Sequence, residues 1–190
     1  VKLVTTLDAL LQDKPDVVVE CAGHAALALH GADILRAGID LIAASVGAFA
    51  DAALHDQVLG AAAHGSARLI IPTGAIGGLD LLKVLSANQA VDVTYRGGKP
   101  PAAWKGSPAD RRIDLDGLTE RSVFFAGSGR DAATEFPKNA NVVAALALAG
   151  AGFDSIKVEL IADPKAQSNT HAYDVASDLC NYTIEIANAA

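Results

Sequence analysis

The most chemically suggestive stretch of the chain is a polar cluster at the start of an apolar helix. Lys138, Asn139 and Asn141 lie in the segment FPKNAN, and a run of Ala, Leu and Val follows. Asn139 can cap this helix, because an Asn side-chain oxygen accepts a backbone N–H that has no partner in the first turn. A cap explains only one of the three polar residues, so Lys138 and Asn141 become candidates for contact with a ligand.

One histidine has a similarly polar setting. His171 lies in DPKAQSNTHAYD, where we expect a loop to enter a strand. An imidazole in such a place can exchange protons near pH 7. The alternative is a surface histidine next to a turn. The remaining histidines fall in or beside expected helices, where we expect them to point to solvent or toward a sheet.

Three lysines lie in segments that we expect to be loops: Lys99, Lys105 and Lys138. Each taken alone is explained by solvation, but a small dianionic substrate needs cations of this kind around it. Two of them belong to the Pro- and Gly-rich segment 97–117, and a long loop in a compact domain is usually functional or mobile. Trp104 either packs to hold this loop in place or serves only the core. We expect Lys138 and one of the two loop lysines to bind substrate.

The first seventy residues alternate between strand and helix patterns. A continuous β-branched run such as DVVVECA is typical of a strand buried on both faces of a parallel sheet. Short connections between such elements indicate a doubly wound α/β fold. The expected strands are 16–22, 39–45 and 67–72, and the expected helices are 25–38 and 51–65.

Small residues follow the strands of this predicted sheet, in the segments ECAG, SVGA and TGAIGG. Ligands bind beyond the carboxyl ends of the strands in doubly wound sheets. Cys21 and Ala22 would let a flat cofactor approach the backbone, and Ser45 or Thr73 can add a hydroxyl. The alternative is that these small residues only serve tight turns. A G-x-G-x-x-G phosphate fingerprint is absent, so the sequence contains half of a dinucleotide site.

The pattern changes after Pro72. A Gly-rich turn leads into a helix, and strands are expected at 91–96, 121–127 and 155–163, with two more over 169–188. One helix covering such strands makes an α+β sheet domain. We therefore divide the chain into residues 1–72, the C-terminal part of a Rossmann-like domain, and residues 73–190, an α+β catalytic and dimerisation domain.

Composition excludes several classes of function. The chain has 190 residues, 51% of them hydrophobic, and a net charge of −7 without a basic stripe, which argues against nucleic-acid binding. Charges interrupt every apolar run, so no membrane span is expected, and the N-terminus lacks a secretory signal. Cys21 and Cys180 have neither disulfide-framework nor zinc-site spacing, so we expect no metal and a cytoplasmic location.

Several segments together resemble the L-aspartate dehydrogenase family, in order through nearly the whole chain. They are VVVECAGHAA, AGIDLIAASVGAFAD, PTGAIGGLDLL, GGKPPAAWKGSPA, FAGSGRDAATEFPKNANVVAALALAGAGFD and ADPKAQSNTHAYDV. The FPKNAN and NTH parts are the most specific. The resemblance implies a Rossmann domain followed by an α+β catalytic domain that also forms a homodimer.

The resemblance also implies an activity and its residues. L-aspartate would be oxidised with NAD or NADP to iminoaspartate, which hydrolyses to oxaloacetate and ammonia and links the family to de novo NAD biosynthesis. The catalytic histidine of the family falls on His171. Its cofactor-contacting Ala and Asn fall on Ala75 and Asn141, and Lys138 becomes a substrate candidate, with Lys99 as a second.

The chain departs from the family pattern at its ends. The first βαβ unit with its phosphate-binding turn and a C-terminal segment are not seen, and there is no Met, so we expect a part of a longer polypeptide. The preference between NAD and NADP is read after the second strand of a Rossmann domain, which precedes Val1. Two alternatives stay open: a related dehydrogenase for another amino or hydroxy acid, and a non-catalytic dimerisation or ligand-sensing module.

Overall fold

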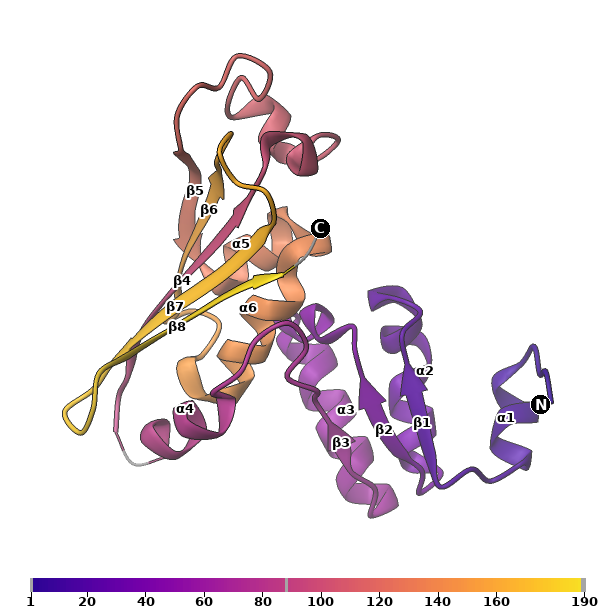
Figure 1. Ribbon diagram of the computed structural model, residues 1–190. Helices are drawn as coiled ribbons and strands as arrows, with labels where there is room; N and C mark the ends of the chain where they lie inside the picture. Colours follow the sequence, from indigo (N-terminus) through magenta and orange to yellow (C-terminus); the bar gives the residue numbers. More distant parts are fainter. Residues whose placement is uncertain (1, 88, 189–190) are drawn as a thin grey trace. The chain divides into compact units, whose positions relative to one another are not determined.

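A three-stranded parallel sheet organises the N-terminal part of the chain (Figure 1). The computed structural model describes residues 2–87 and 89–188, which divide into two compact units, 1–72 and 73–190. In the first unit the sheet has the order β1 (Val17–Glu20), β2 (Asp40–Ala43) and β3 (Leu69–Ile70), and both pairs are parallel. The helices α2 (His24–Arg36) and α3 (Ala52–Gly65) make the two crossovers.

The core of this unit follows the apolar periodicity of the sequence. Leu27, Ile34 and Leu35 of α2 are buried, as their helical spacing predicts. The strand predicted over 67–72 is shorter, Leu69–Ile70, because its pairing with β2 covers only those two residues. A short helix that the sequence analysis did not foresee, α1 (Leu7–Gln12), begins where the Thr6 hydroxyl accepts from the Ala9 N–H.

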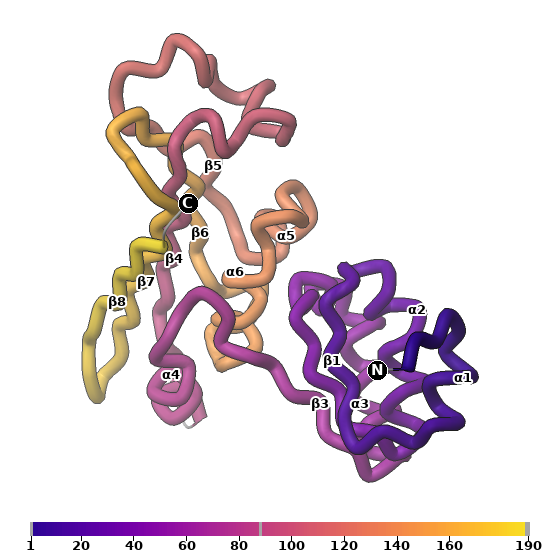
Figure 2. The backbone as a smooth tube through the Cα atoms, turned by 45° about the vertical axis from the view of Figure 1, so that its right-hand side comes forward, coloured from indigo at the N-terminus to yellow at the C-terminus, as the bar shows by residue number. Residues whose placement is uncertain are grey.

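The second unit is built on a five-stranded mixed sheet of order β5-β6-β4-β7-β8. Strands β4 and β6 are parallel and the other neighbours are antiparallel. Figures 1 and 2 show α5 and α6 together on one side of this sheet. The strands are β4 (Asp92–Lys99), β5 (Ser122–Ser128), β6 (Lys157–Ala162), β7 (Asn169–Ala176) and β8 (Tyr182–Asn188). The helices are α4 (Leu79–Ser86), α5 (Gly129–Glu135) and α6 (Ala140–Leu146). A π-helical segment, Ala147–Ala151, continues α6.

The segment 97–117 is not a structureless loop, which corrects the prediction. Its first residues continue β4 to Lys99, and two 3₁₀ helices follow, Pro101–Trp104 and Pro108–Arg111. Trp104 is buried, packs edge-on against Phe124 with the ring centroids 4.8 Å apart, and donates from Nε1 to the Ile161 carbonyl at 2.9 Å. Trp104 therefore both belongs to the core and holds this segment in place.

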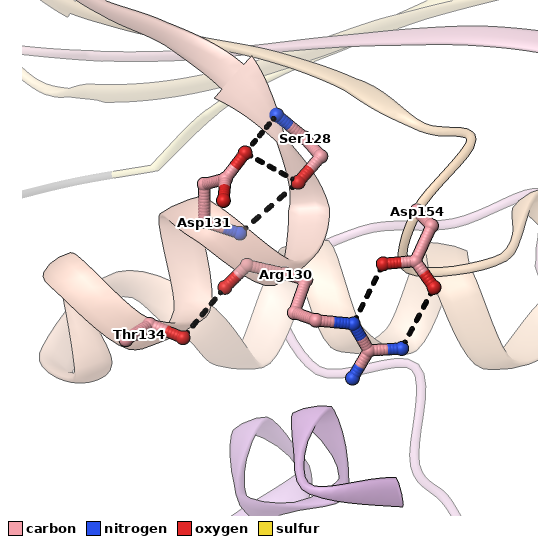
Figure 3. Close-up of polar contacts among 5 residues, drawn as sticks. All are labelled: Ser128, Arg130, Asp131, Thr134 and Asp154. Atoms are coloured by element: carbon pink, nitrogen blue, oxygen red, sulfur yellow. Dashed lines mark hydrogen bonds and ion pairs between the residues drawn. The ribbon is translucent and has the colours of Figure 1, made fainter.

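The entry into α5 is fixed by local polar contacts (Figure 3). The Ser128 Oγ accepts from the Asp131 N–H at 3.1 Å and the Asp131 carboxylate accepts from the Ser128 N–H at 3.1 Å, which is a capping box. Arg130 donates to both carboxylate oxygens of Asp154, at 2.6 and 2.9 Å. The capping box thus fixes the start of α5, and the ion pair joins α5 to the turn that precedes β6.

Within residues 2–87 and 89–188, no helix combines the length and the apolar character needed to cross a bilayer.

Candidate active site

A pocket of about 190 Å³ lies in the second unit, where β4 and β7 meet the start of α6. Most of its lining comes from the two strands and residues 138–142, and Trp104 and Leu160 of β6 complete it. The lining includes both an ionisable ring and two ammonium groups, and its polar members include Tyr95, Lys99, Lys138, Asn139, Asn141, Asn169 and His171.

Strand register explains why these residues meet. Side chains alternate between the two faces of a strand, so Tyr95, Gly97 and Lys99 share one face of β4. Gly97 lies opposite His171 on β7 and opposite Leu160 on β6. This register places His171 on the same face of the sheet as Lys99. Gly97 has no side chain, which leaves space for a pocket on that face.

His171 is hydrogen-bonded to a buried phenol. Its Nδ1 lies 2.7 Å from the hydroxyl of Tyr95, a side chain that is only 2% exposed. Burial and the nearby positive charge of Lys99 lower the pKa of His171, so the imidazole is neutral near pH 7. Burial raises the pKa of Tyr95, which keeps its phenol protonated. His171 is the third residue of β7, close to the entry of the strand, as expected.

Lys99 is the last residue of β4, which corrects its prediction as a loop residue. Its Nζ donates to Asn139 Oδ1 and lies 4.8 Å from the centre of the Trp104 ring. Burial lowers the pKa of Lys99, although the side chain remains half-buried rather than enclosed. The ammonium group is thus held by an amide and an aromatic face, neither of which neutralises its charge.

Asn139 stands at the N-cap position of α6 but makes no side-chain cap hydrogen bond within the described chain, contrary to the prediction. Its backbone angles, φ −117° and ψ 7°, differ from the extended conformation that a capping side chain requires. Its Oδ1 instead accepts from Lys99. Asn139 therefore belongs to the pocket.

Of the other predicted residues of this unit, some line the pocket and others do not. Lys138 and Asn141 are exposed and line the pocket. Lys105 lies outside the lining and pairs on the surface with Asp116. Ala75 is exposed in the turn before α4 and is not among the lining residues. A hydrogen bond of 2.6 Å from the Tyr173 hydroxyl to the Gly77 carbonyl joins that turn to β7.

In the first unit, a buried carboxylate joins the two strand ends that carry Cys21, Ala22 and Ser45. Glu20 Oε1 accepts from the N–H groups of Ala22 at 2.7 Å and Gly23 at 2.9 Å and from the Ser45 hydroxyl at 3.0 Å. Its Oε2 accepts from the Ser45 N–H at 3.0 Å. Burial acts to raise the pKa of Glu20, but these hydrogen bonds outweigh it and the pKa is lowered.

The sequence analysis missed Glu20, although an acidic residue at the end of a β-branched strand is itself an unusual signal. Cys21 and Ala22 are exposed at this strand end, and Ser45 is buried. The hydroxyl proton of Ser45 is committed to Glu20, so toward a ligand Ser45 can act only as an acceptor.

Comparisons with known families define the class of protein. Residues 1–72 match a family model described as the NAD-binding domain of homoserine dehydrogenase, and residues 80–190 match one described as the C-terminal domain of aspartate dehydrogenase. A parallel α/β unit that binds NAD or NADP, followed by an α+β unit with a polar pocket, is the build of a nicotinamide-dependent dehydrogenase. This match confirms the predicted fold class and the predicted type of cofactor.

Individual relatives identify the family. The chain is 45% identical over 189 residues to L-aspartate dehydrogenase 2 of Bordetella bronchiseptica, covering all of this chain and 71% of that protein. It is 47% identical to the L-aspartate dehydrogenase of Ruegeria pomeroyi, over 90% of this chain and 62% of that one. The crystal structure of aspartate dehydrogenase from Thermotoga maritima superposes with a TM-score of 0.79 at 33% identity, over 91% of this chain and 68% of that chain. The chain belongs to the aspartate dehydrogenase family, which confirms the resemblance.

Proposed function

We propose that this protein oxidises L-aspartate to iminoaspartate with NAD or NADP, and that the imine is hydrolysed to oxaloacetate and ammonia. The observation that carries the proposal is the pocket of the second unit, which combines two ammonium groups with an imidazole that is neutral near pH 7. The names of the relatives support the same activity.

Recognition of aspartate requires partners for two carboxylates. Placing a carboxylate in a partly dry pocket without such partners is costly, and charge-assisted hydrogen bonds offset that cost. Lys99 is the stronger candidate, because Asn139 and the Trp104 ring already hold its ammonium group in the pocket. Lys138 is the second candidate and approaches from the exposed rim.

NAD or NADP would accept the hydride from the α-carbon of aspartate. The strand ends of the first unit fit such a group, because Cys21 and Ala22 are exposed and a Cβ added to Gly23 would meet nothing within 4 Å. Gly23 has a φ of 111°, a conformation that other residues rarely adopt, and Glu20 holds its N–H. We propose contacts from Cys21, Ala22 and Ser45, together with Ala75 and Asn141 of the second unit.

His171 is the proposed general acid/base. Tyr95 occupies its Nδ1, so Nε2 is the nitrogen left to hold or exchange a proton with substrate or water. General acid–base catalysis contributes roughly 10²–10⁴-fold to a rate. The lowered pKa makes the neutral ring available at the pH of the cell interior.

The test of this function is product identification with the natural full-length protein. Incubation with L-aspartate and NAD or NADP should release ammonia, oxaloacetate and reduced cofactor in equal amounts. Reduced cofactor without ammonia would indicate a hydroxy-acid dehydrogenase, and no reduction with either cofactor would indicate a non-catalytic module. We also propose a homodimer and a supply of iminoaspartate to de novo NAD biosynthesis, both supported by the family resemblance alone, and a cytoplasmic location, supported by the cysteine spacing.

A further inference from the structure

The hydroxyl of Tyr95 has one partner among the described residues, Nδ1 of His171 at 2.7 Å. The side chain is 2% exposed, so bulk water does not replace that partner. The two ring planes are within 20° of each other and their centroids are 6.1 Å apart, as in a contact between the end of the phenol and the edge of the imidazole. The hydroxyl therefore meets the lone pair of Nδ1 rather than the face of the ring.

This contact distinguishes the two neutral forms of His171. With the imidazole proton on Nε2, Nδ1 accepts the Tyr95 hydroxyl proton and both buried groups are paired. With the proton on Nδ1, the ring donates to the phenol oxygen, and the phenol proton then lacks an acceptor. A buried donor without a partner costs about 1–3 kcal/mol, which corresponds to a preference of about 5- to 150-fold for the form protonated on Nε2.

We propose that Tyr95 is a positioning residue that keeps the proton of neutral His171 on Nε2, so that His171 meets the substrate as a hydrogen-bond donor. The proposal rests on the proposed function for its role in catalysis. It gives the neutral ring the role of a hydrogen-bond donor that keeps its proton, because an imidazole protonated on Nε2 has no lone pair there to act as a base. A donor at this place suits a substrate carboxylate, or the oxygen that water adds to the imine carbon.

The charges around the ring agree with a neutral donor. The residues that line the pocket include the cations Lys99 and Lys138 and, within the described chain, no carboxylate. Histidines that work as imidazolium are commonly paired with a carboxylate that stabilises the charged ring. Here a phenol takes that place, and its raised pKa keeps it protonated and able to donate.

Gly97 makes the contact possible. A Cβ added to Gly97 would lie 2.8 Å from the Tyr95 hydroxyl oxygen and 3.2 Å from its ring carbon Cε1. Gly97 lies between Tyr95 and Lys99 on the same face of β4 and opposite His171. Any side chain at this position would collide with the phenol and displace it from Nδ1. Gly97→Ala therefore moves the hydroxyl without removing it.

The test is nitrogen NMR of protein labelled with ¹⁵N in its histidine rings, recorded without substrate. The unmodified protein should give a protonated-type Nε2 signal and an acceptor-type Nδ1 signal for His171. Tyr95→Phe and Gly97→Ala should both shift these signals toward an average of the two forms. Tyr173→Phe is the matched control for the spectrum, because Tyr173 lies opposite Tyr95 in the register but donates to Gly77.

A protonated Nδ1 in the unmodified protein would overturn the proposal, and so would a Tyr95→Phe spectrum identical to that of the unmodified protein. The spectrum of the unmodified protein decides the tautomer even where a variant does not fold. In activity, Tyr95→Phe should lower kcat by roughly 10- to 100-fold with little change in KM, the range found for partners that orient metal-bound histidines. Since the NMR readout needs neither substrate nor cofactor, it stands whether or not aspartate is the substrate.

Discussion

Replacing Lys99 by Met tests the binding part of the proposed site most sharply. Met keeps the length and the apolar stem of the side chain and removes the ammonium group that lies beside Asn139 and the Trp104 ring. A hydrogen bond to a charged group contributes about 1.5–3 kcal/mol, and each 1.4 kcal/mol is about ten-fold in affinity. We therefore expect the KM for aspartate to rise by about 10- to 150-fold, measured as initial rates at saturating cofactor.

The same variant carries a second, independent signature. Burial and the charge of Lys99 both lower the pKa of His171 from its ordinary value of 6.5. Removing Lys99 leaves only the effect of burial, so the pKa of His171 should rise toward 6.5. Because the neutral ring is the active form, the acidic limb of kcat/KM should lie below 6.5 in the unmodified protein and move to higher pH in Lys99→Met.

Stability separates these effects from unfolding. The pKa of Lys99 is lowered by burial, which means that the folded state disfavours its charge, so Met at this place should leave the melting temperature unchanged or raise it. Lys105→Met is the matched control, because Lys105 is exposed and pairs with Asp116 away from the pocket. An unchanged KM in Lys99→Met would refute its role in substrate binding, and an unmoved acidic limb would refute its coupling to His171.

Three further substitutions test the other parts of the site. His171→Ala should lower kcat by roughly 10²–10⁴-fold with cofactor affinity nearly unchanged, and full turnover would remove His171 from the mechanism. Lys138→Ala should raise the KM for aspartate by less than Lys99→Met does, because solvent screens a charge at the exposed rim, and the reverse order would make Lys138 the main carboxylate partner. Glu20→Gln should weaken cofactor binding and cost about 1–3 kcal/mol of stability, since an amide presents a donor toward N–H and O–H groups that need an acceptor. Because folding lowers the pKa of Glu20 from its ordinary value of 4.5, the ionised carboxylate stabilises the fold above pH 4.5, and this contribution is lost as the pH falls. Glu20→Gln should therefore also flatten the decline of the melting temperature below pH 4.5. An unchanged decline would show that another group causes it.

Local patterns in the sequence were sufficient for the strands and the two long helices of the α/β unit, but not for α1 or for the exposure of Val17 and Val19 on β1. The strand DVVVECA and the helix with Leu27, Ile34 and Leu35 depend on β-branched content and 3.6-residue spacing, which act within a few residues. Lys138 could be found for a similar reason, because a polar residue stands out before an apolar helix, whereas His171 stood out among the histidines by its polar neighbours. These residues drew attention by composition alone, and the structure then placed both at one pocket.

The remaining site residues depend on pairing between distant segments. Gly97 and Gly98 precede a Pro-rich stretch and look like a loop, yet β4 runs through them because β6 and β7 flank it on both sides. That extension places Lys99 in the pocket, and the pairing of β4 with β7 places the Tyr95 hydroxyl beside Nδ1 of His171. Glu20 likewise gains two of its four hydrogen bonds from Ser45, 25 residues away. No pattern within a short window contains this information.

The most direct test of the proposed function is the ratio of kcat/KM across a substrate panel with the natural full-length protein. The panel holds L-aspartate, L-alanine, L-glutamate and L-malate, each with NAD and with NADP, followed by the absorbance of the reduced cofactor. A pocket that pairs its ammonium groups with both carboxylates should reject alanine by about 10- to 150-fold, because one ammonium group then loses its charged partner. It should reject the longer glutamate by roughly 10- to 200-fold. Aspartate should therefore be the best substrate by a wide margin. Equal kcat/KM for alanine or malate would contradict recognition of aspartate at this site.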